Sequence, residues 1–221
     1  MITYIVCVYR PELYHRVCYP QLERQQREYG AQVIQVSSED SIREAYEAGR
    51  QQAEHPIACY LHEDVELLDN NATEIVLGAM HATGAGVSGV VGSAYNHKRC
   101  PWWKAKQYVG GWATEGTQGL VWNDGPSGNT QSRYDSQAPV RARAHLLDGI
   151  VLADRMGDTP WERGKGWHGY DIDRCMQAHR AGLEVWTMPL RVVHHNQPHD
   201  EAWTKACKPT WLGMKVKWGL D

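Results

Sequence analysis

Three ionisable residues, His62, Glu63 and Asp64, come directly after the apolar run Ile57–Leu61. The run is predicted to be a buried strand. Acidic groups crowded at the end of a strand repel one another unless a cation or the donors of a ligand compensate them. A divalent ion bound to a diphosphate would supply that cation. Taken alone, the cluster is equally compatible with an exposed polar turn.

Two further acids, Asp171 and Asp173, lie at the start of a segment predicted to be a helix, residues 169–181. Asp171 falls in the first turn, where the free backbone N–H groups favour a carboxylate. Asp173 lies two residues later, about 200° around the helix, so the two side chains cannot face one site. Ordinary acids at a helix N-terminus would give the same pattern, so this cluster alone establishes no catalytic residue.

A third cluster is the pair His194 and His195, which follows the apolar residues Val192 and Val193. Adjacent residues of a strand point to opposite faces, so at most one of the two histidines is expected to be a ligand. A histidine pair considered by itself is more often structural than functional.

The elements that must position these clusters follow from the hydrophobic pattern of the first ninety residues. Strands are predicted at residues 2–8, 31–36, 57–61 and 87–91. Helices are predicted at residues 11–29 with a kink at Pro20, from a cap at Ser38 or Asp40 to residue 54, and at residues 71–83. This alternation implies a largely parallel sheet covered by helices, with ligands at the carboxyl ends of its strands.

The second half of the chain is less regular. Residues 92–145 are rich in Gly, Trp and polar residues and are expected to form long loops, which in compact domains tend to be functional lids. Regular structure returns with a strand-like run at 144–153, the helix at 169–181, and strands at 183–188 and 192–196. No linker separates two domains, so the expected organisation is one domain over residues 1–221. Its parts are residues 1–91, the loop-rich middle (92–145), residues 146–198 and a C-terminal tail (199–221).

The segment 84–89 matches the dinucleotide-binding pattern G-x-G-x-x-G by letter. That fingerprint needs a strand before it and a helix after it, whereas here a helix precedes and a strand follows. We interpret it as a helix-to-strand turn.

Composition narrows the class of protein further. A net charge of −3 and a pI of about 6.4 argue against a protein that coats nucleic acid, although not against a local basic patch. No apolar run approaches the roughly 18 residues of a transmembrane helix. The short apolar start lacks the features of a signal peptide. A cytoplasmic protein with six reduced cysteines is therefore expected.

The order of the clusters along the chain resembles that of the GT-A glycosyltransferases. A strand that ends in His62-Glu63-Asp64 is followed by Asp148-Gly149, then by the acids that open the late helix, then by the histidine pair. The order is most similar to that of the small family typified by a streptomycin-biosynthesis glycosyltransferase, in which a strand-ending H-x-D-V replaces the usual D-x-D. This resemblance implies an α/β fold of the GT-A, Rossmann-like kind, and transfer of a sugar from a nucleotide-sugar donor. It also implies that residues 1–91 are the nucleotide-binding half and residues 146–198 the acceptor or catalytic half.

The resemblance also implies roles for individual residues. Asp64 and His194 correspond to metal ligands, with His195 facing away, and Asp171 corresponds to the catalytic base. The residues that correspond to the donor site are Val8, Tyr9, Arg10, His62, Glu63, Asp148 and Gly149. Three departures stand out: His62 replaces the first acid of D-x-D, Tyr170 replaces a Glu, and Ser37-Ser38 replaces a base-recognising Asp.

With Asp171 as the only well-placed base, a single displacement with inversion is the simplest mechanism. Carboxylate and imidazole ligands suit Mn²⁺ or Mg²⁺, and Mn²⁺ matches a histidine ligand better. Two rival functions remain open. A nucleotidyltransferase would be expected to carry a Gly-rich and cationic loop after its first strand, and a glycan- or nucleic-acid-binding module would leave the acidic clusters without a purpose.

The acceptor is expected to bind near Tyr170 and near a segment that interleaves cations with Trp102 and Trp103. Aromatic rings stack on sugars or bases, and cations pair with phosphates. An anionic acceptor is therefore expected: a phosphorylated lipid, a phosphate-bearing glycan or a modified nucleic acid. Alternatively, these tryptophans only close an exposed flank of the sheet.

Overall fold

The structure is a computed structural model that describes residues 1–93, 117–123, 130–134, 141–155, 157, 159–195 and 201–219. Its centre is a seven-stranded sheet. In spatial order the strands are β2 (Gln32–Val36), β1 (Thr3–Cys7), β3 (Ala58–His62), β11 (Val151–Asp154), β5 (Val87–Gly89), β12 (Val185–Thr187) and β9 (Arg143–Ala144).

Most strands of this sheet run in one direction. β1 pairs in parallel with β2 and β3, and β12 pairs in parallel with β5. β11 is antiparallel to both of its neighbours, β3 and β5, so the two parallel groups point the same way. Only β11 and β9 are reversed. The mainly parallel α/β sheet predicted from the sequence is thereby confirmed.

A second, six-stranded sheet was not predicted. Its path is β10 (Leu146–Leu147), β6 (Val91–Ser93), β7 (Thr117–Asn123), β13 (Val192–His194) and β4 (Val65–Leu67), and β8 (Thr130–Tyr134) pairs with β7. The expected loop-rich middle, residues 92–145, therefore contains β7, β8 and most of β6 of this sheet, and also β9 of the main sheet. The single strand expected at residues 87–91 is two strands, because the chain leaves the main sheet at Val90 and enters the second one.

The chain passes between the two sheets at the places where the chemical clusters lie. Glu63 and Asp64 are the only residues between β3 of the main sheet and β4 of the second sheet. Asp148 and Gly149 lie between β10 and β11, which again belong to different sheets. The junction of the sheets is therefore where these side chains meet.

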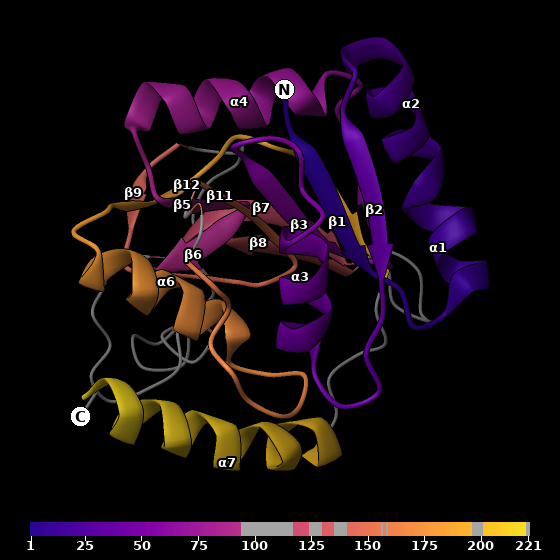
Figure 1. Cartoon of the computed structure of the whole chain (residues 1–221). Helices are drawn as coiled ribbons and strands as arrows, with labels where there is room; N and C mark the ends of the chain where they lie inside the picture. Colours follow the sequence, from indigo (N-terminus) through magenta and orange to yellow (C-terminus); the bar gives the residue numbers. More distant parts are fainter. Residues whose placement is uncertain are drawn as a thin grey trace.

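Helices cover both faces of the main sheet (Figure 1). On one face lie α2 (Tyr19–Tyr29) and α4 (Ala72–Thr83). The short helix α1 (Pro11–Val17) comes directly before α2 in the chain and packs against it. On the other lie α3 (Ile42–Arg50) and α6 (Tyr170–Arg180), and α7 (Glu201–Trp218) packs outside α6. These layers bury one continuous apolar core that includes Ile5, Leu61 and Val151.

Two details of the predicted helices were wrong. The helix expected at 11–29 is interrupted at Cys18 rather than kinked at Pro20, because Pro20 lies in the first turn of α2, where its missing N–H costs nothing. The helix expected to start at Ser38 or Asp40 is capped by Ser41, whose hydroxyl accepts a hydrogen bond from the N–H of Arg43 at 3.2 Å. The hydroxyl of Ser38 instead accepts hydrogen bonds from the backbone N–H groups of Asp40 and Ser41, at 3.3 and 3.2 Å.

The segment 84–89 is the helix-to-strand turn that was predicted, with Gly84 ending α4 in the left-handed conformation at φ 65°. Cys7, Cys18, Cys59, Cys175 and Cys207 are buried free thiols. In the described part of the chain, no helix has the length and apolar character needed to cross a membrane. The cytoplasmic location expected from the sequence stays a prediction.

Candidate functional site

Three side chains converge at the junction of the sheets: His62, Asp64 and His194. Each offers one ligand atom, and these atoms lie within 4.8 Å of one another. His62 ends β3, and Asp64 lies in the turn that follows. His194 comes from the far end of the chain, because β13 pairs antiparallel with β4 and places His194 opposite Val65. Its Nε2 lies 3.3 Å from Oδ1 of Asp64.

The electrostatics of this group favour an ionised Asp64 carboxylate beside a neutral His62 imidazole. Burial alone would raise the pKa of Asp64, but the contact with His194 and the charge of Arg10 hold that pKa well below its usual range. Burial lowers the pKa of His62 to about 4, with further contributions from neighbouring histidines. His62 is therefore neutral at physiological pH, as a metal ligand must be.

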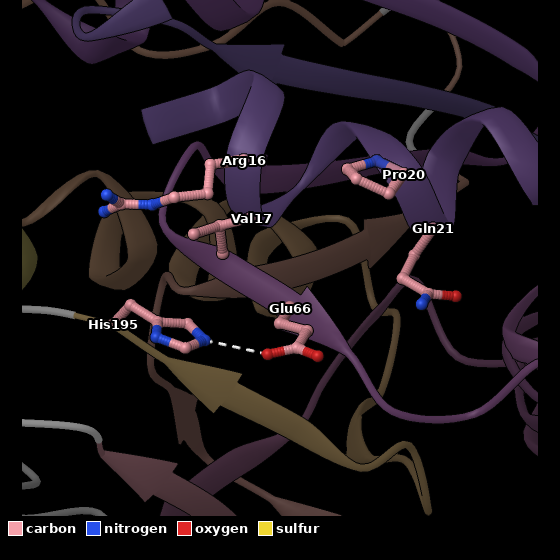
Figure 2. Close-up of a pocket in the computed structure, with 6 residues that line it drawn as sticks. All are labelled: Arg16, Val17, Pro20, Gln21, Glu66 and His195. Atoms are coloured by element: carbon pink, nitrogen blue, oxygen red, sulfur yellow. Dashed lines mark hydrogen bonds and ion pairs between the residues drawn. The ribbon is translucent and has the colours of Figure 1, made fainter. Parts of the chain in front are cut away.

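His195 lies on the other side of the same strand, as alternation predicts. Its Nε2 is 2.8 Å from Oε2 of Glu66, and its backbone N–H donates to the carbonyl of Asp64 at 2.8 Å. Glu66 and His195 line a pocket of about 370 Å³ beneath α1 and α2, together with Arg16, Val17, Pro20 and Gln21 (Figure 2). The side chains of the two adjacent histidines therefore have different partners: His194 contacts Asp64, and His195 contacts Glu66.

The carboxylate of Glu63 contacts the loop after β1. Its Oε2 accepts from the backbone N–H groups of Tyr9 and Arg10 at 2.5 and 2.6 Å, and its Oε1 accepts from Nε of Arg10 at 2.7 Å. The carboxylate thereby fixes the loop at the end of β1. The second arm of the Arg10 guanidinium reaches to 3.3 Å from Oδ2 of Asp64, and half of this side chain remains exposed.

The residues at the end of β1 border the site. Val8 packs at the edge of the core, and its N–H donates to the carbonyl of Val36. Tyr9 is 70% exposed, and its ring contacts that of Trp167 edge to face, with the ring centroids 5.8 Å apart. Trp167 was not singled out in the sequence. Its position four residues before the candidate base Asp171 is the feature of the sequence that could have indicated a place near the site.

Asp148 and Gly149 form the turn between β10 and β11. Oδ1 of Asp148 accepts from the N–H of Ile150 at 3.0 Å. Asp171 lies in the first turn of α6 and remains partly exposed. Burial, together with the charge of Asp148, raises the pKa of Asp171 to about 7. A carboxylate with this pKa is a stronger base near neutral pH than an ordinary aspartate.

Tyr170 is only 4% exposed, so it presents little surface to an acceptor. Its hydroxyl lies 2.5 Å from Nε2 of His62, and its ring packs directly against Gly149. The structure thus places Tyr170 under the group formed by His62, Asp64 and His194.

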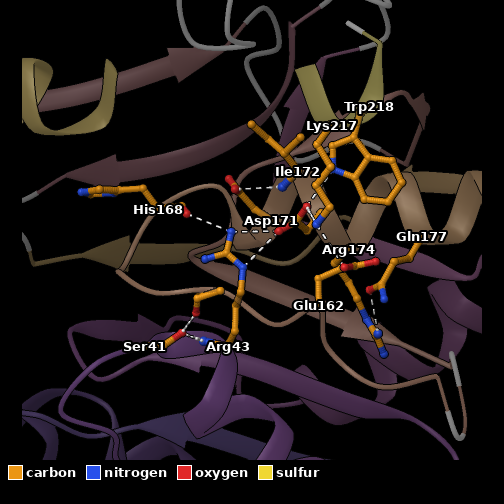
Figure 3. Close-up of polar contacts among 12 residues, drawn as sticks. Ser41, Arg43, Glu162, His168, Asp171, Ile172, Arg174, Gln177, Lys217 and Trp218 are labelled. Atoms are coloured by element: carbon orange, nitrogen blue, oxygen red, sulfur yellow. Dashed lines mark hydrogen bonds and ion pairs between the residues drawn. The ribbon is translucent and has the colours of Figure 1, made fainter. Parts of the chain in front are cut away.

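Asp173 points away from Asp171, as the helical period predicts. It is buried between Nε and Nη2 of Arg43, at 3.0 and 2.9 Å, and two groups of α7, Nζ of Lys217 and Nε1 of Trp218, at 2.8 and 2.7 Å. Arg43 also donates to the carbonyl of His168 at 3.0 Å (Figure 3). Neither Arg43 nor α7 was anticipated, because these partners are far apart in sequence and carry no motif.

The acceptor residues expected at Trp102 and Trp103, and the nearby cations, lie outside the described residues.

Comparison with known proteins identifies the family. Residues 3–209 match the model of the glycosyltransferase-like family. No curated protein matches the sequence. Among solved structures, the mannosyltransferase PcManGT from Pyrobaculum calidifontis, in complex with GDP-Man and Mn²⁺, has a TM-score of 0.56 at 11% identity. That alignment covers 100% of this chain but only 64% of PcManGT.

A second structure, S. aureus TarS 1–349, has a TM-score of 0.54 at 10% identity, and the alignment covers 98% of this chain and 72% of TarS. At such low identities the likeness is one of fold. The family match is independent of it and spans nearly the whole chain. The chain therefore belongs to the glycosyltransferase-like family and has the GT-A fold, which confirms the expected enzyme class.

Proposed function

We propose that this chain transfers a sugar from a nucleotide-sugar donor to an acceptor hydroxyl, with a divalent ion held by His62, Asp64 and His194. The observation that carries the proposal is the convergence of these side chains at the end of a central parallel strand. Ligands of open α/β sheets bind at the carboxyl ends of strands.

The three residues fit a metal ion. Oδ1 of Asp64 is buried. Nε2 of His194 lies 3.3 Å away, but within the described part of the chain no donor reaches this oxygen with hydrogen-bond geometry, so it is an atom that an ion would satisfy. One carboxylate and two imidazoles suit Mn²⁺ better than Mg²⁺, which prefers oxygen ligands. PcManGT, which has a similar fold, holds Mn²⁺ with its donor, and this supports the same choice. When bound, the ion would offset the charge that develops on the departing diphosphate.

The chain's own residues account for the rest of the reaction. Glu63 holds the guanidinium of Arg10 beside Asp64, where it would form an ion pair with a phosphate of the donor. The Asp148-Gly149 turn lies next to Asp171 and is assigned to the donor sugar. Asp171, with its raised pKa, would accept the proton of the acceptor hydroxyl as the anomeric bond forms. A single base of this kind supports inversion in one displacement.

Finer assignments rest on the sequence. The strand-ending His62-x-Asp64-Val65 motif supports a closer relationship to the family typified by a streptomycin-biosynthesis glycosyltransferase. The cations around Trp102 and Trp103 support an anionic acceptor: a phosphorylated lipid, a phosphate-bearing glycan or a modified nucleic acid. Tyr170 is too buried for a large acceptor contact, so we reassign it below.

A donor screen tests the proposal against its two rivals. Purified protein is incubated with UDP-, GDP-, dTDP- and CMP-sugars and with MnCl₂ or EDTA, and the nucleotide products are measured. Slow release of a nucleoside diphosphate or monophosphate, abolished by EDTA, is expected from a transferase that uses water in place of its acceptor. Release of pyrophosphate from a nucleoside triphosphate and a sugar phosphate would indicate a nucleotidyltransferase. No turnover and no nucleotide binding would indicate a non-catalytic module.

A further inference from the structure

The phenol of Tyr170 joins α6 to the candidate metal site. Tyr170 is the first residue of α6, and Gly169 before it adopts φ 75°. The side chain enters the core rather than the solvent and ends 2.5 Å from Nε2 of His62. It is therefore adjacent in sequence to the candidate base and in contact with a candidate metal ligand.

Aromatic packing fixes the position of this ring. Tyr170 packs on Tyr46 edge to face at 5.8 Å, and on Trp161 at 6.2 Å between ring centroids. Tyr46 and Trp161 are themselves buried and pack on Tyr60. A ring held by several aromatic neighbours has little freedom to rotate, so its hydroxyl is a fixed point for His62.

The close approach also depends on Gly149. A Cβ at this position would collide with the phenol oxygen and with the carbons next to it. Only glycine leaves room for the hydroxyl to reach His62 while the turn between β10 and β11 keeps its course. Gly149 thus serves the Tyr170–His62 contact in addition to any role toward the donor.

We infer that Tyr170 is a positioning residue that holds His62 in the orientation in which it binds a divalent ion, with Gly149 providing the space. The inference deepens the proposed function and rests on it. A histidine that binds a metal through one ring nitrogen commonly hydrogen-bonds through the other, which fixes the ring and its tautomer. Nε2–H of His62 would donate to the Tyr170 oxygen and leave Nδ1 for the ion.

The test measures the affinity for Mn²⁺ alone, from the electron paramagnetic resonance signal of free Mn²⁺. Tyr170→Phe keeps the ring and removes the hydroxyl, and we expect Kd to rise roughly tenfold or more, as is typical for loss of such a partner. The matched control is Tyr46→Phe. It removes another buried hydroxyl of the same aromatic cluster, one that makes no hydrogen bond to the described residues. We expect this control to leave Kd unchanged.

A second variant tests the role of Gly149. Gly149→Ala should also raise Kd for Mn²⁺, and in the Tyr170→Phe background it should add little, because the contact it disturbs is already gone. Full additivity of the two effects would contradict the shared mechanism.

The outcomes separate this inference from the proposed function. If wild type binds Mn²⁺ and Tyr170→Phe binds it equally well or more tightly, the positioning role is wrong and the metal site stands. If wild type and Asp64→Asn both fail to bind Mn²⁺, the metal site and the inference fall together.

Discussion

Arg43 and Asp173 are 130 residues apart in sequence and form a fully buried ion pair, with Nη2 and Oδ2 2.9 Å apart. The pair joins α3 to α6 at a position two residues after the candidate base Asp171. Because Arg43 also binds the carbonyl of His168, it holds the segment that leads into α6. The geometry of Asp171 thus depends on a charge pair that does not itself contact the site.

Removing one partner of this pair should destabilise the protein strongly. Asp173→Ala leaves the guanidinium of Arg43 buried without its carboxylate, which typically costs about 3–5 kcal/mol. Chemical denaturation followed by circular dichroism measures the loss. The matched control is Glu28→Ala, which breaks its weak surface pairs with Arg27 and Arg24 and should cost at most about 1 kcal/mol. Equal losses for the two variants would mean that Asp173 contributes no more than a surface acid.

The raised pKa of Asp171 predicts how the reaction depends on pH. The base must be ionised, so the transfer rate should rise as pH increases through about 7. Asp171→Asn should lower the rate by roughly 10²–10⁴-fold and leave donor binding intact. A rate that does not change between pH 6 and pH 8, or a variant with near-normal turnover, would rule out this base.

The raised pKa of Asp171 also predicts how the stability of the fold depends on pH: stability should fall as pH rises, whereas the transfer rate should increase. The folded state binds the Asp171 proton more tightly than the unfolded chain does, so stability falls as pH rises from the ordinary aspartate range through about 7. Asp171→Asn removes this loss. Its Tm relative to wild type should therefore be higher at pH 8 than at pH 5, measured by differential scanning fluorimetry. A difference that is independent of pH would contradict the burial of an ionised Asp171.

Substitutions of the two adjacent histidines should differ in their effect on Mn²⁺ affinity. His194→Gln should weaken Mn²⁺ binding, because its Nε2 lies beside Asp64. His195→Gln should not, because its ring contacts Glu66 on the other side of the strand. Calorimetric titration of the two variants with Mn²⁺ measures both. Loss of binding in the His195 variant alone would reverse the assignment.

Much of the fold could be predicted from the sequence, because its first half has clear local periods. The buried runs that became β1, β2 and β3 and the helix that became α4 lie within a few residues of their predicted bounds. The second sheet could not be predicted in the same way. Several of its strands span two or three residues, and its pairings join segments that are far apart, as β4 and β13 are.

The candidate site likewise combines residues that local patterns indicate with contacts that depend on long-range strand pairing. Asp64 and Asp171 could be proposed because each falls at the end of a recognisable element. The family resemblance also indicated Asp64 and His194 as metal ligands, but it assigned His62 to the donor. The convergence of all three depends on the pairing of β13 with β4, which no local pattern in the sequence shows. Glu63 illustrates the remaining limit: its position indicated a donor contact, whereas its oxygens are taken up by Tyr9 and Arg10.

That arrangement of Glu63 predicts an effect on the donor. Glu63→Ala frees the loop after β1, since hydrogen bonds to a charged group contribute about 1.5–3 kcal/mol each. The donor KM should therefore rise by about tenfold or more. Glu12→Ala, which removes an exposed acid from the same region, is the control and should leave KM unchanged. Steady-state kinetics with the donor found in the screen provide the comparison.

The most direct test of the central claim is calorimetric titration of wild type and Asp64→Ala with UDP, GDP and dTDP, each in the presence of MnCl₂ or EDTA. A nucleotide-sugar-dependent transferase with its ion at His62, Asp64 and His194 should bind at least one nucleoside diphosphate in Mn²⁺. The binding should be lost in EDTA and in Asp64→Ala, whose circular dichroism spectrum should match that of wild type. Equal affinity of wild type and Asp64→Ala, or binding that EDTA does not change, would contradict the account.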